Sequence, residues 1–176
     1  MSAAVPPAVP AADPPSLATV RALPCVLDAV VDPTHVDDVF AHLTVTGHLA
    51  LHAAASAAVL ARLGIAPTPD ARAGSGAMDL EHHLRYLGEV ALGAEVAVYE
   101  RLLGRAGRTF HGVRYLVDRT GGQVASSFEF VSVHVDLATR RAAPFPPAVA
   151  ARLDEAVAAG ATHTEAVPRC TTLGLR

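Results

Sequence analysis

The sequence contains no tryptophan, and aromatic residues make up only 5% of it, so a series of rings on which bases could stack is not expected. A block of basic residues is also missing, and the formal net charge is -3 at pH 7. Proteins that bind nucleic acid neutralise phosphates with clustered arginine and lysine. These two features argue against nucleic acid as a partner.

Cysteine is scarce, because only Cys25 and Cys170 are present and they lie near opposite ends of the chain. Neither a disulfide framework nor a metal-spaced pair is expected from them, and a reducing cytoplasm is the expected location. The apolar run 49–65 is shorter than about 18 residues and contains a histidine, a serine and an arginine, so a membrane span is not expected. The first residues lack the basic region and continuous apolar stretch of a signal peptide.

The length of 176 residues and the apolar content of 51% are enough for one domain with a core. Residues 1–20 are rich in alanine and proline and predict a disordered tail. Residues 161–176 have no clear period and predict a second tail. The folded domain is therefore predicted to span residues 21–160.

A long helix is predicted at the centre of this domain. Thr44 or Thr46 is the expected N-cap, Gly64 is the expected C-terminal stop, and an alanine-rich apolar run lies between them. On a helical wheel one sector is polar and the opposite side is nearly all alanine. The polar sector comprises Thr44, His48, His52, Ser56 and Arg62; the alanine side comprises Ala50, Ala53, Ala54, Ala57, Ala58 and Ala61. We expect the alanine side to be buried and the polar stripe to face a pocket or a partner.

Extended segments precede and follow this helix. Residues 24–31 predict a short strand, and after a loop at 66–76 four longer stretches follow at the spacing of antiparallel hairpins, with glycines in their connections. The four stretches are 78–90, 95–103, 108–117 and 124–136, and a second helix is expected over 147–159 with Gly160 after it. Phe128 and Phe130 are expected to mark the core face of the last strand. The predicted fold class is α+β, with one antiparallel sheet curled around the long helix, which is the hotdog architecture.

Three sequence blocks resemble those of the 4-hydroxybenzoyl-CoA-type hotdog thioesterases, and more closely the betainyl-CoA thioesterase-like branch associated with carnitine degradation. The first block is Asp38, Val39, Phe40, Ala41, His42, Leu43, Thr44 and Val45, followed by Leu63 and Gly64 at the helix end. The second is Glu81, His83, Tyr86, Leu87, Glu89, Val90 and Gly93, and the third is Glu129, His134, Val135, Asp136, Leu137, Arg140, Arg141, Pro144, Phe145 and Pro146. The resemblance covers roughly residues 24–158. The sequence differs from the family at Ala41 (a glycine there), at Thr44 (an asparagine there), and at Ala50 and Leu51, where an aromatic pair is usual.

The resemblance implies hydrolysis of a small acyl-CoA or related thioester, with Asp38 as general base or nucleophile. Asp37 is the alternative carboxylate if the loop register differs. The amides of residues 44–47 lie at a helix N-terminus, where free N–H groups and a partial positive charge suit a carbonyl oxygen. His42 is expected to orient Asp38 or line the pocket, and Thr44 to offer a hydroxyl or simply to cap the helix.

Five further residues are predicted to contact the substrate: Val45, His48, His52, Glu81 and His83. Glu81 and His83 lie on the same face of their strand and are expected to reach the pocket. Arg85, Arg105, Arg108 and Arg114 are candidates for binding the phosphates of coenzyme A, which is expected only as part of the substrate. His48 and His52 have the i, i+4 spacing of two metal ligands, but without an HExxH glutamate or a cysteine cluster no metal and no cofactor are expected.

The resemblance also implies a homodimer or a dimer of dimers, with no nucleic acid and no membrane as partner. Two other functions are consistent with the sequence. One is non-hydrolytic biosynthetic chemistry, a dehydration or cyclisation that uses the helix histidines. The other is a non-catalytic protein that binds an acyl thioester or an apolar ligand.

Overall fold

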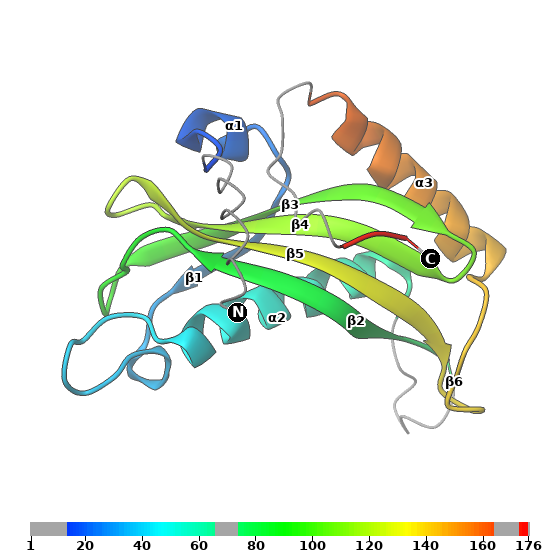
Figure 1. Ribbon diagram of the computed structural model, residues 1–176, viewed down its shortest axis with the longest axis horizontal. Coiled ribbons are helices and arrows are strands. Elements are labelled where there is room, and N and C mark those ends of the chain that lie inside the picture. Colours follow the sequence, from blue (N-terminus) through cyan, green and yellow to red (C-terminus); the bar gives the residue numbers. More distant parts are fainter. Residues whose placement is uncertain (1–13, 66–73, 164–172, 176) are drawn as a thin grey trace, which may run out of the picture.

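In the computed structural model, which describes residues 14–65, 74–163 and 173–175, an antiparallel sheet curls around one long helix (Figure 1). The elements in chain order are α1 (Leu17–Arg21), β1 (Cys25–Val30), the 3-10 turn η1 (Pro33–His35), α2 (Val45–Leu63), β2 (Ser75–Tyr86), β3 (Glu95–Ala106), β4 (Thr109–Asp118), β5 (Gln123–Asp136), β6 (Arg141–Ala142) and α3 (Pro147–Ala161). The predicted α+β class and the hotdog arrangement are confirmed.

The central helix α2 begins and ends where its capping residues predict. The Thr44 hydroxyl accepts the Gly47 N–H at 3.0 Å, and this bond satisfies one of the free amides of the first turn. Gly64 ends the helix in the left-handed conformation, with φ of 78°, and the Ile65 N–H reaches back to the Leu60 carbonyl at 2.8 Å.

The prediction of which side of α2 is buried is wrong. The buried side consists of Gly47, His48, Leu51, His52, Ala55, Val59 and Leu63, so two histidines of the polar stripe face the sheet. Ala50, Ala53, Ala54, Ala57 and Ala61 are exposed, and Ala58 is half-buried. Large side chains fill the space under a curled sheet better than alanine does, and the histidines are tolerated there because the sheet supplies a hydrogen-bond partner.

The strand order in the sheet is β1-β3-β4-β5-β2, and β6 pairs with the end of β5. β3, β4 and β5 form the two hairpins that the sequence predicts, with Gly107 and Gly122 at positive φ in the turns. A hairpin between β2 and β3 was also expected, and this prediction is wrong, because β2 pairs with β5 at the far edge of the sheet.

The connection from β2 to β3 crosses the end of the sheet and is held by backbone hydrogen bonds. Val31 donates to the Ala94 carbonyl at 3.0 Å, and Gly93 donates to the Val31 carbonyl at 2.8 Å. Leu43, just before α2, donates to the Val90 carbonyl at 2.8 Å. These bonds replace a β2–β3 ladder, and they fix the entry of α2 against the end of β1.

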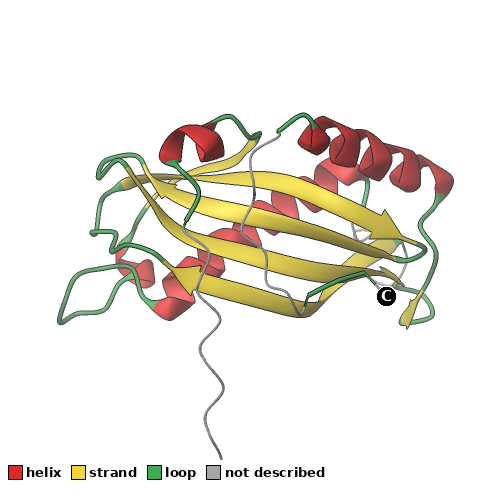
Figure 2. Cartoon of the chain, turned by 45° about the horizontal axis from the view of Figure 1, so that its top comes forward, coloured by secondary structure: helices red, strands yellow, loops and turns green. Residues whose placement is uncertain are grey.

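The two faces of the sheet carry separate apolar cores. Inside the curl, α2 packs on β1, β3, β4 and β5, with Phe128 and Phe130 buried as predicted. The short helix α1 lies over the opposite face (Figure 2). Its fully buried Val20 packs with Tyr99, Tyr115 and their neighbours. None of the described helices has both the length and the apolarity that crossing a bilayer requires.

The predicted limits of the domain need two corrections. Residues 17–20 were assigned to a disordered tail but belong to α1, because Ser16 caps that helix and Val20 gives it a buried anchor. At the other end α3 continues through the buried Gly160 to Ala161, so Gly160 lies inside the helix and does not stop it. Glycine is needed there because a Cβ would lie 2.8 Å from the Leu102 carbonyl oxygen. Residues 1–13, most of the 66–76 loop and most of the C-terminal tail lie outside the described residues.

Candidate functional site

A pocket of about 330 Å³ lies at the start of α2, where the helix entry meets the end of β2. Its lining residues are His42, Leu43, Thr44, Val45, His48, Tyr86, Gly88 and Glu89. Four of the predicted site residues are therefore brought together: His42, Thr44, Val45 and His48. The other predicted residues, Asp38, His52, Glu81 and His83, do not line it.

The first turn of α2 is fixed by the 3-10 turn η1. The His35 carbonyl accepts both the Thr44 N–H at 2.9 Å and the Thr44 hydroxyl at 3.1 Å. Only glycine fits at position 47, because a Cβ there would lie 2.3 Å from the same carbonyl oxygen. Of the amides at 44–47, those of Thr44 and Gly47 are thus engaged, whereas Val45 and Thr46 have no acceptor among the described residues.

The loop before α2 separates its two carboxylates. Asp37 accepts the N–H groups of Val39 at 2.9 Å and Phe40 at 2.6 Å, and these bonds hold the pKa of its carboxyl below the usual range. Its Oδ2 lies 3.9 Å from His42 Nε2. Asp38 is exposed and has no hydrogen-bond or ion-pair partner among the described residues. The structural role in the loop therefore belongs to Asp37, and Asp38 is left without one.

Ala41 adopts a backbone conformation that favours glycine. Its φ is 54°, in the left-handed region where the Cβ is unfavourable. The Ala41 carbonyl accepts the Leu92 N–H at 3.1 Å and the Ala41 N–H donates to the Asp37 carbonyl at 3.1 Å, so both sides of the residue are held. The resemblance described above implies a glycine at this position, and the left-handed turn favours that residue.

Two histidines of α2 share one serine from β5. Ser126 Oγ lies 3.0 Å from His48 Nδ1 and 3.0 Å from His52 Nε2. All three residues are buried. His48 also meets the edge of the Tyr86 ring, with centroids 5.2 Å apart, and His52 stacks on Phe128 at 5.1 Å.

Burial lowers the pKa of both histidines. The pKa of His48 falls to about 4, first because the ring is desolvated and second because His42 is near. The pKa of His52 falls well below its usual value, mainly because the ring is desolvated and second because of the charge of Arg114. Both rings are consequently neutral near pH 7, and each can still donate one hydrogen bond and accept another.

Glu81 and His83 lie on the face of the sheet opposite the pocket, so their predicted role is wrong. The register pairs Glu81 with Val131 and His83 with Glu129, whereas Phe128, which stacks on His52, pairs with Leu84. Paired residues in an antiparallel ladder point to the same side of the sheet. A bulge between positions 79 and 81 helps to set this register.

Three residues near the site were not assigned a site role from the sequence: Tyr86, Glu89 and Ser126. Tyr86 and Glu89 belong to the second sequence block, so their presence there was a signal that they matter. Ser126 lies 78 residues from His48, and no local pattern connects the two.

Two of the arginines proposed for the phosphates of coenzyme A are engaged elsewhere. Arg114 is 1% exposed, donates from Nε to Glu100 Oε2 at 2.5 Å and lies over the Phe130 ring at 4.1 Å. It is therefore a core residue, and the prediction is wrong for it. Arg105 pairs with Asp154 on the surface through two hydrogen bonds of 2.6 and 2.5 Å.

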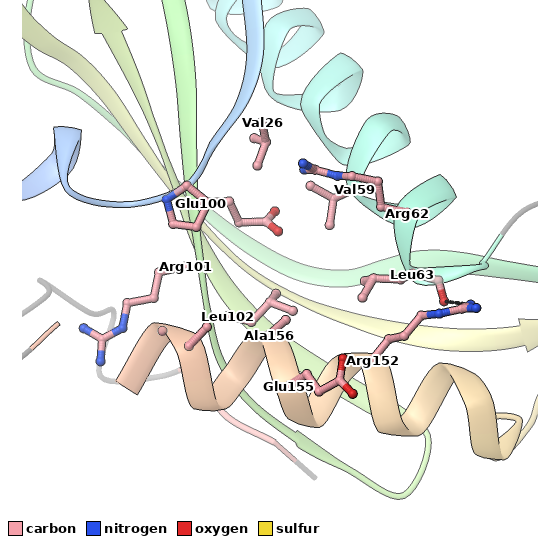
Figure 3. Close-up of a pocket in the computed structure, with 13 residues that line it drawn as sticks. Val26, Val59, Arg62, Leu63, Glu100, Arg101, Leu102, Arg152, Glu155 and Ala156 are labelled. Atoms are coloured by element: carbon pink, nitrogen blue, oxygen red, sulfur yellow. Dashed lines mark hydrogen bonds between the residues drawn. The ribbon is translucent and has the colours of Figure 1, made fainter. Parts of the chain in front are cut away.

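A second cavity, of about 400 Å³, lies near the other end of α2, between this helix, β3 and α3 (Figure 3). Its walls are largely apolar, with Val26, Val59 and Leu102 among them, and Arg62 and Glu100 extend into it from α2 and β3. The Glu100 carboxylate accepts a hydrogen bond from Arg114 Nε, and burial raises the pKa of this carboxyl. This cavity contains none of the predicted site residues.

Metal ligation finds no support in the described part of the chain, where no three His, Cys, Asp or Glu side chains are grouped to hold an ion. His48 and His52 turn one nitrogen each toward Ser126, so the i, i+4 pair is directed at a hydroxyl.

Comparison with known proteins gives consistent similarities. Residues 31–153 match the family model described as the thioesterase-like superfamily. The chain is 33% identical over 113 residues to the betainyl-CoA thioesterase of Pseudomonas aeruginosa, a match that covers 64% of this chain and 71% of that protein. It is 33% identical over 114 residues to the L-carnitine dehydrogenase/betainyl-CoA thioesterase of Agrobacterium fabrum, of which the match spans only 23%.

Solved structures share the fold. The crystal structure of a thioesterase candidate from Pseudomonas putida superposes with a TM-score of 0.70 and 26% identity, covering 88% of this chain and 96% of that one. A hypothetical protein from Staphylococcus aureus, solved in complex with CoA, gives a TM-score of 0.70 at 17% identity, covering 86% and 93%. At that identity the second likeness concerns the fold alone.

Proposed function

The chain belongs to the thioesterase-like superfamily, and from this premise we propose that it hydrolyses a small acyl-CoA thioester in the pocket at the start of α2. One observation supports this most directly. The amides of Val45 and Thr46 are unpaired among the described residues at the positive end of a helix, beside a pocket large enough for an acyl group.

The reaction adds water to the thioester carbonyl carbon. Charge develops on the carbonyl oxygen as the new C–O bond forms, and in this proposal the Val45 and Thr46 amides donate to it. When the C–S bond breaks, the products are a carboxylic acid and the free thiol of coenzyme A. In well-measured enzymes one donor of this kind lowers the activation free energy by about 3–4 kcal/mol.

Asp38 is the proposed general base or nucleophile. Two backbone amides engage Asp37, whereas Asp38 is exposed and has no hydrogen-bond partner among the described residues. Glu89 is the second candidate, since it lines the pocket and Asp38 does not. In this scheme Thr44 holds the first turn of α2 by accepting the Gly47 N–H, and His42 forms part of the pocket wall.

The acyl group we favour is the betainyl group, which is named in both curated relatives. Tyr86 and Glu89 line the pocket, and an aromatic ring and a carboxylate are the groups that suit a quaternary ammonium. No arginine or lysine is among the lining residues, and burial keeps His48 neutral near pH 7.

Release of free thiol from a panel of betainyl-, acetyl-, hexanoyl- and benzoyl-CoA tests the proposal. Asp38→Asn is expected to lower kcat by at least about 100-fold with the fold intact, as a general base contributes on this scale. The matched control is Asp154→Asn, a surface carboxylate on α3 that pairs with Arg105. Unchanged turnover in Asp38→Asn together with its loss in Glu89→Gln would transfer the role to Glu89, and no turnover by the wild type on any thioester would refute hydrolysis.

We also propose that the active form is a homodimer built on β2. This strand ends the sheet, and its outer edge has no partner strand in the described part of the chain. Met78 and Leu80 on it are 63% and 57% exposed, and Phe40 beside the site is 73% exposed. Light scattering should give twice the mass of the chain, and Leu80→Lys should shift it toward the monomer. A cytoplasmic location stays a prediction.

For the non-hydrolytic alternative, a dehydration or cyclisation, the geometry leaves one candidate histidine. His52 is fully buried and does not line the pocket, so of the two helix histidines only His48 could touch a substrate. Analysis of the products separates the three functions: acid and thiol indicate hydrolysis, a modified thioester indicates dehydration or cyclisation, and binding without a product indicates a binding protein.

A further inference from the structure

The contact between Ser126 and the two histidines restricts where their protons can be. Ser126 Oγ carries one hydrogen and lies 3.0 Å from a ring nitrogen of each histidine. A neutral imidazole has one N–H and one bare nitrogen. In a chain of such groups the placement of one proton therefore decides the placement of the others.

The buried end of this chain is His52 Nδ1, which has no hydrogen-bond partner among the residues that the structure describes. If Nδ1 carried the proton, an N–H donor would be buried without an acceptor, and orphaned N–H groups of this kind are rare in proteins. We therefore assign the His52 proton to Nε2, which then donates to Ser126 Oγ. The serine hydroxyl in turn donates its single hydrogen to His48 Nδ1.

This order leaves the proton of His48 on Nε2. Nδ1 is turned to Ser126 on β5, and the ring also borders the pocket, so Nε2 is the nitrogen left for a ligand. Val45, whose amide is free, lines the same pocket, and Thr46 follows it in the first turn of α2, so the His48 ring and the start of the helix border one space.

We infer that the His52–Ser126–His48 chain holds His48 as a neutral N–H donor directed at the carbonyl oxygen of the bound thioester. The inference rests on the proposed hydrolysis and adds a third donor to the Val45 and Thr46 amides. His48 is then a catalytic residue, and Ser126 and His52 are positioning residues that act through it.

The surroundings of the chain agree with this role. Desolvation lowers the pKa of both rings, and the charges of His42 on His48 and of Arg114 on His52 lower them further, so both rings stay neutral. A neutral imidazole stabilises the developing oxyanion by donating a hydrogen bond to it, and the ring keeps its own proton. Tyr86 meets the His48 ring edge-on and Phe128 stacks on His52, so neither ring can turn without moving a neighbour.

Two-bond proton–nitrogen correlation spectra of the histidine rings test the chain directly. We expect His48 with its proton on Nε2 in the wild type, and a mixture of the two neutral forms in Ser126→Ala. A wild-type His48 with its proton on Nδ1 would overturn the assignment. The matched control is Ser127→Ala, the neighbouring buried serine on the opposite face of β5, which should leave the His48 signals unchanged.

Kinetics on the best substrate of the CoA panel tests the donor role. His48→Leu should lower kcat by about 100-fold or more, and His48→Gln should lose less, because its amide keeps an N–H donor. Ser126→Ala should lower kcat by about tenfold or more with little change in KM, which is the usual scale for a group that orients another. Equal losses in His48→Gln and His48→Leu, or full activity in a folded Ser126→Ala protein, would refute the role. Absence of any wild-type turnover beside an Nε2 proton on His48 would refute the hydrolysis and leave the proton assignment standing.

Discussion

Removal of one partner of the buried ion pair between Arg114 and Glu100 should be strongly destabilising. Arg114 is 1% exposed and Glu100 is 6% exposed, so in Arg114→Met the carboxylate would stay in the core without its counter-ion. Loss of one partner of such a pair costs about 3–5 kcal/mol of unfolding free energy. For a chain of this size we expect the melting temperature to fall by roughly 6–20 °C, at about 2–4 °C per kcal/mol.

The loss should depend on pH in a defined direction. Burial already raises the pKa of Glu100 despite the attraction of Arg114, and without Arg114 the pKa must rise further. A carboxyl whose pKa is higher in the folded state binds its proton more tightly there, so stability falls as pH rises from the unfolded value toward the folded one. Arg114→Met should therefore be closer to the wild type at pH 5 than at pH 8.

Urea denaturation followed by circular dichroism at both pH values measures these effects, since the chain has no tryptophan for fluorescence. The double variant Glu100→Gln/Arg114→Met removes both charges and should recover most of the loss at pH 8. A single variant as stable as the wild type, or a double variant no more stable than the single one, would show that the pair does not behave as an isolated buried ion pair.

Three further outcomes are expected from the helix entry and its histidines. Gly47→Ala should lower the unfolding free energy by about 1–3 kcal/mol in a thermal melt, because its Cβ collides with the His35 carbonyl. Ala41→Gly should raise it by up to about 1 kcal/mol, since relief of a left-handed alanine outweighs the added freedom of glycine; a lower melting temperature would contradict this. Stability should fall as pH drops from about 6.5 to about 4, since the unfolded chain protonates His48 and the folded one does not, and His48→Gln should make the fall less steep.

The elements themselves were predictable because their signals are local. Thr44 and Gly64 lie at the ends of α2 and act through bonds within one turn, so their positions in the sequence identify the helix. The turns at Gly107 and Gly122 likewise connect strands that are neighbours in the chain. The fold class followed from the order of these elements.

The orientation of α2 was not predictable from its own residues. A helical wheel treats His48 and His52 as polar and assigns them to a pocket or to a partner, away from the buried side. Both are buried against the sheet, where Ser126 bonds them, and only His48 also lines the pocket. Alanine, which costs little when exposed, was left on the outer side. The partner of a polar group decides whether the group can be buried, and that partner is set by the tertiary structure.

The site was only partly predictable for a related reason. The resemblance pointed to the helix entry, and four of the residues it indicated, His42, Thr44, Val45 and His48, line the candidate pocket there. For Glu81 and His83 the period of the strand showed that they share a face, but the register against β5 decides which face it is. Strand order and register depend on pairings between distant segments, which no local pattern reports.

The place of β2 at the far edge of the sheet has a consequence for how the chain folds. Its pairing with β5 joins residues far apart in the sequence, for example Leu84 with Phe128, whereas β3, β4 and β5 are linked by short turns. Closing a long loop costs more chain entropy than closing a short one, and contacts distant in sequence form late. The β3–β4–β5 meander is therefore the expected folding nucleus, and the docking of β2 over α2 is the step that completes the pocket. Substitutions in β2 should then speed unfolding more than they slow folding.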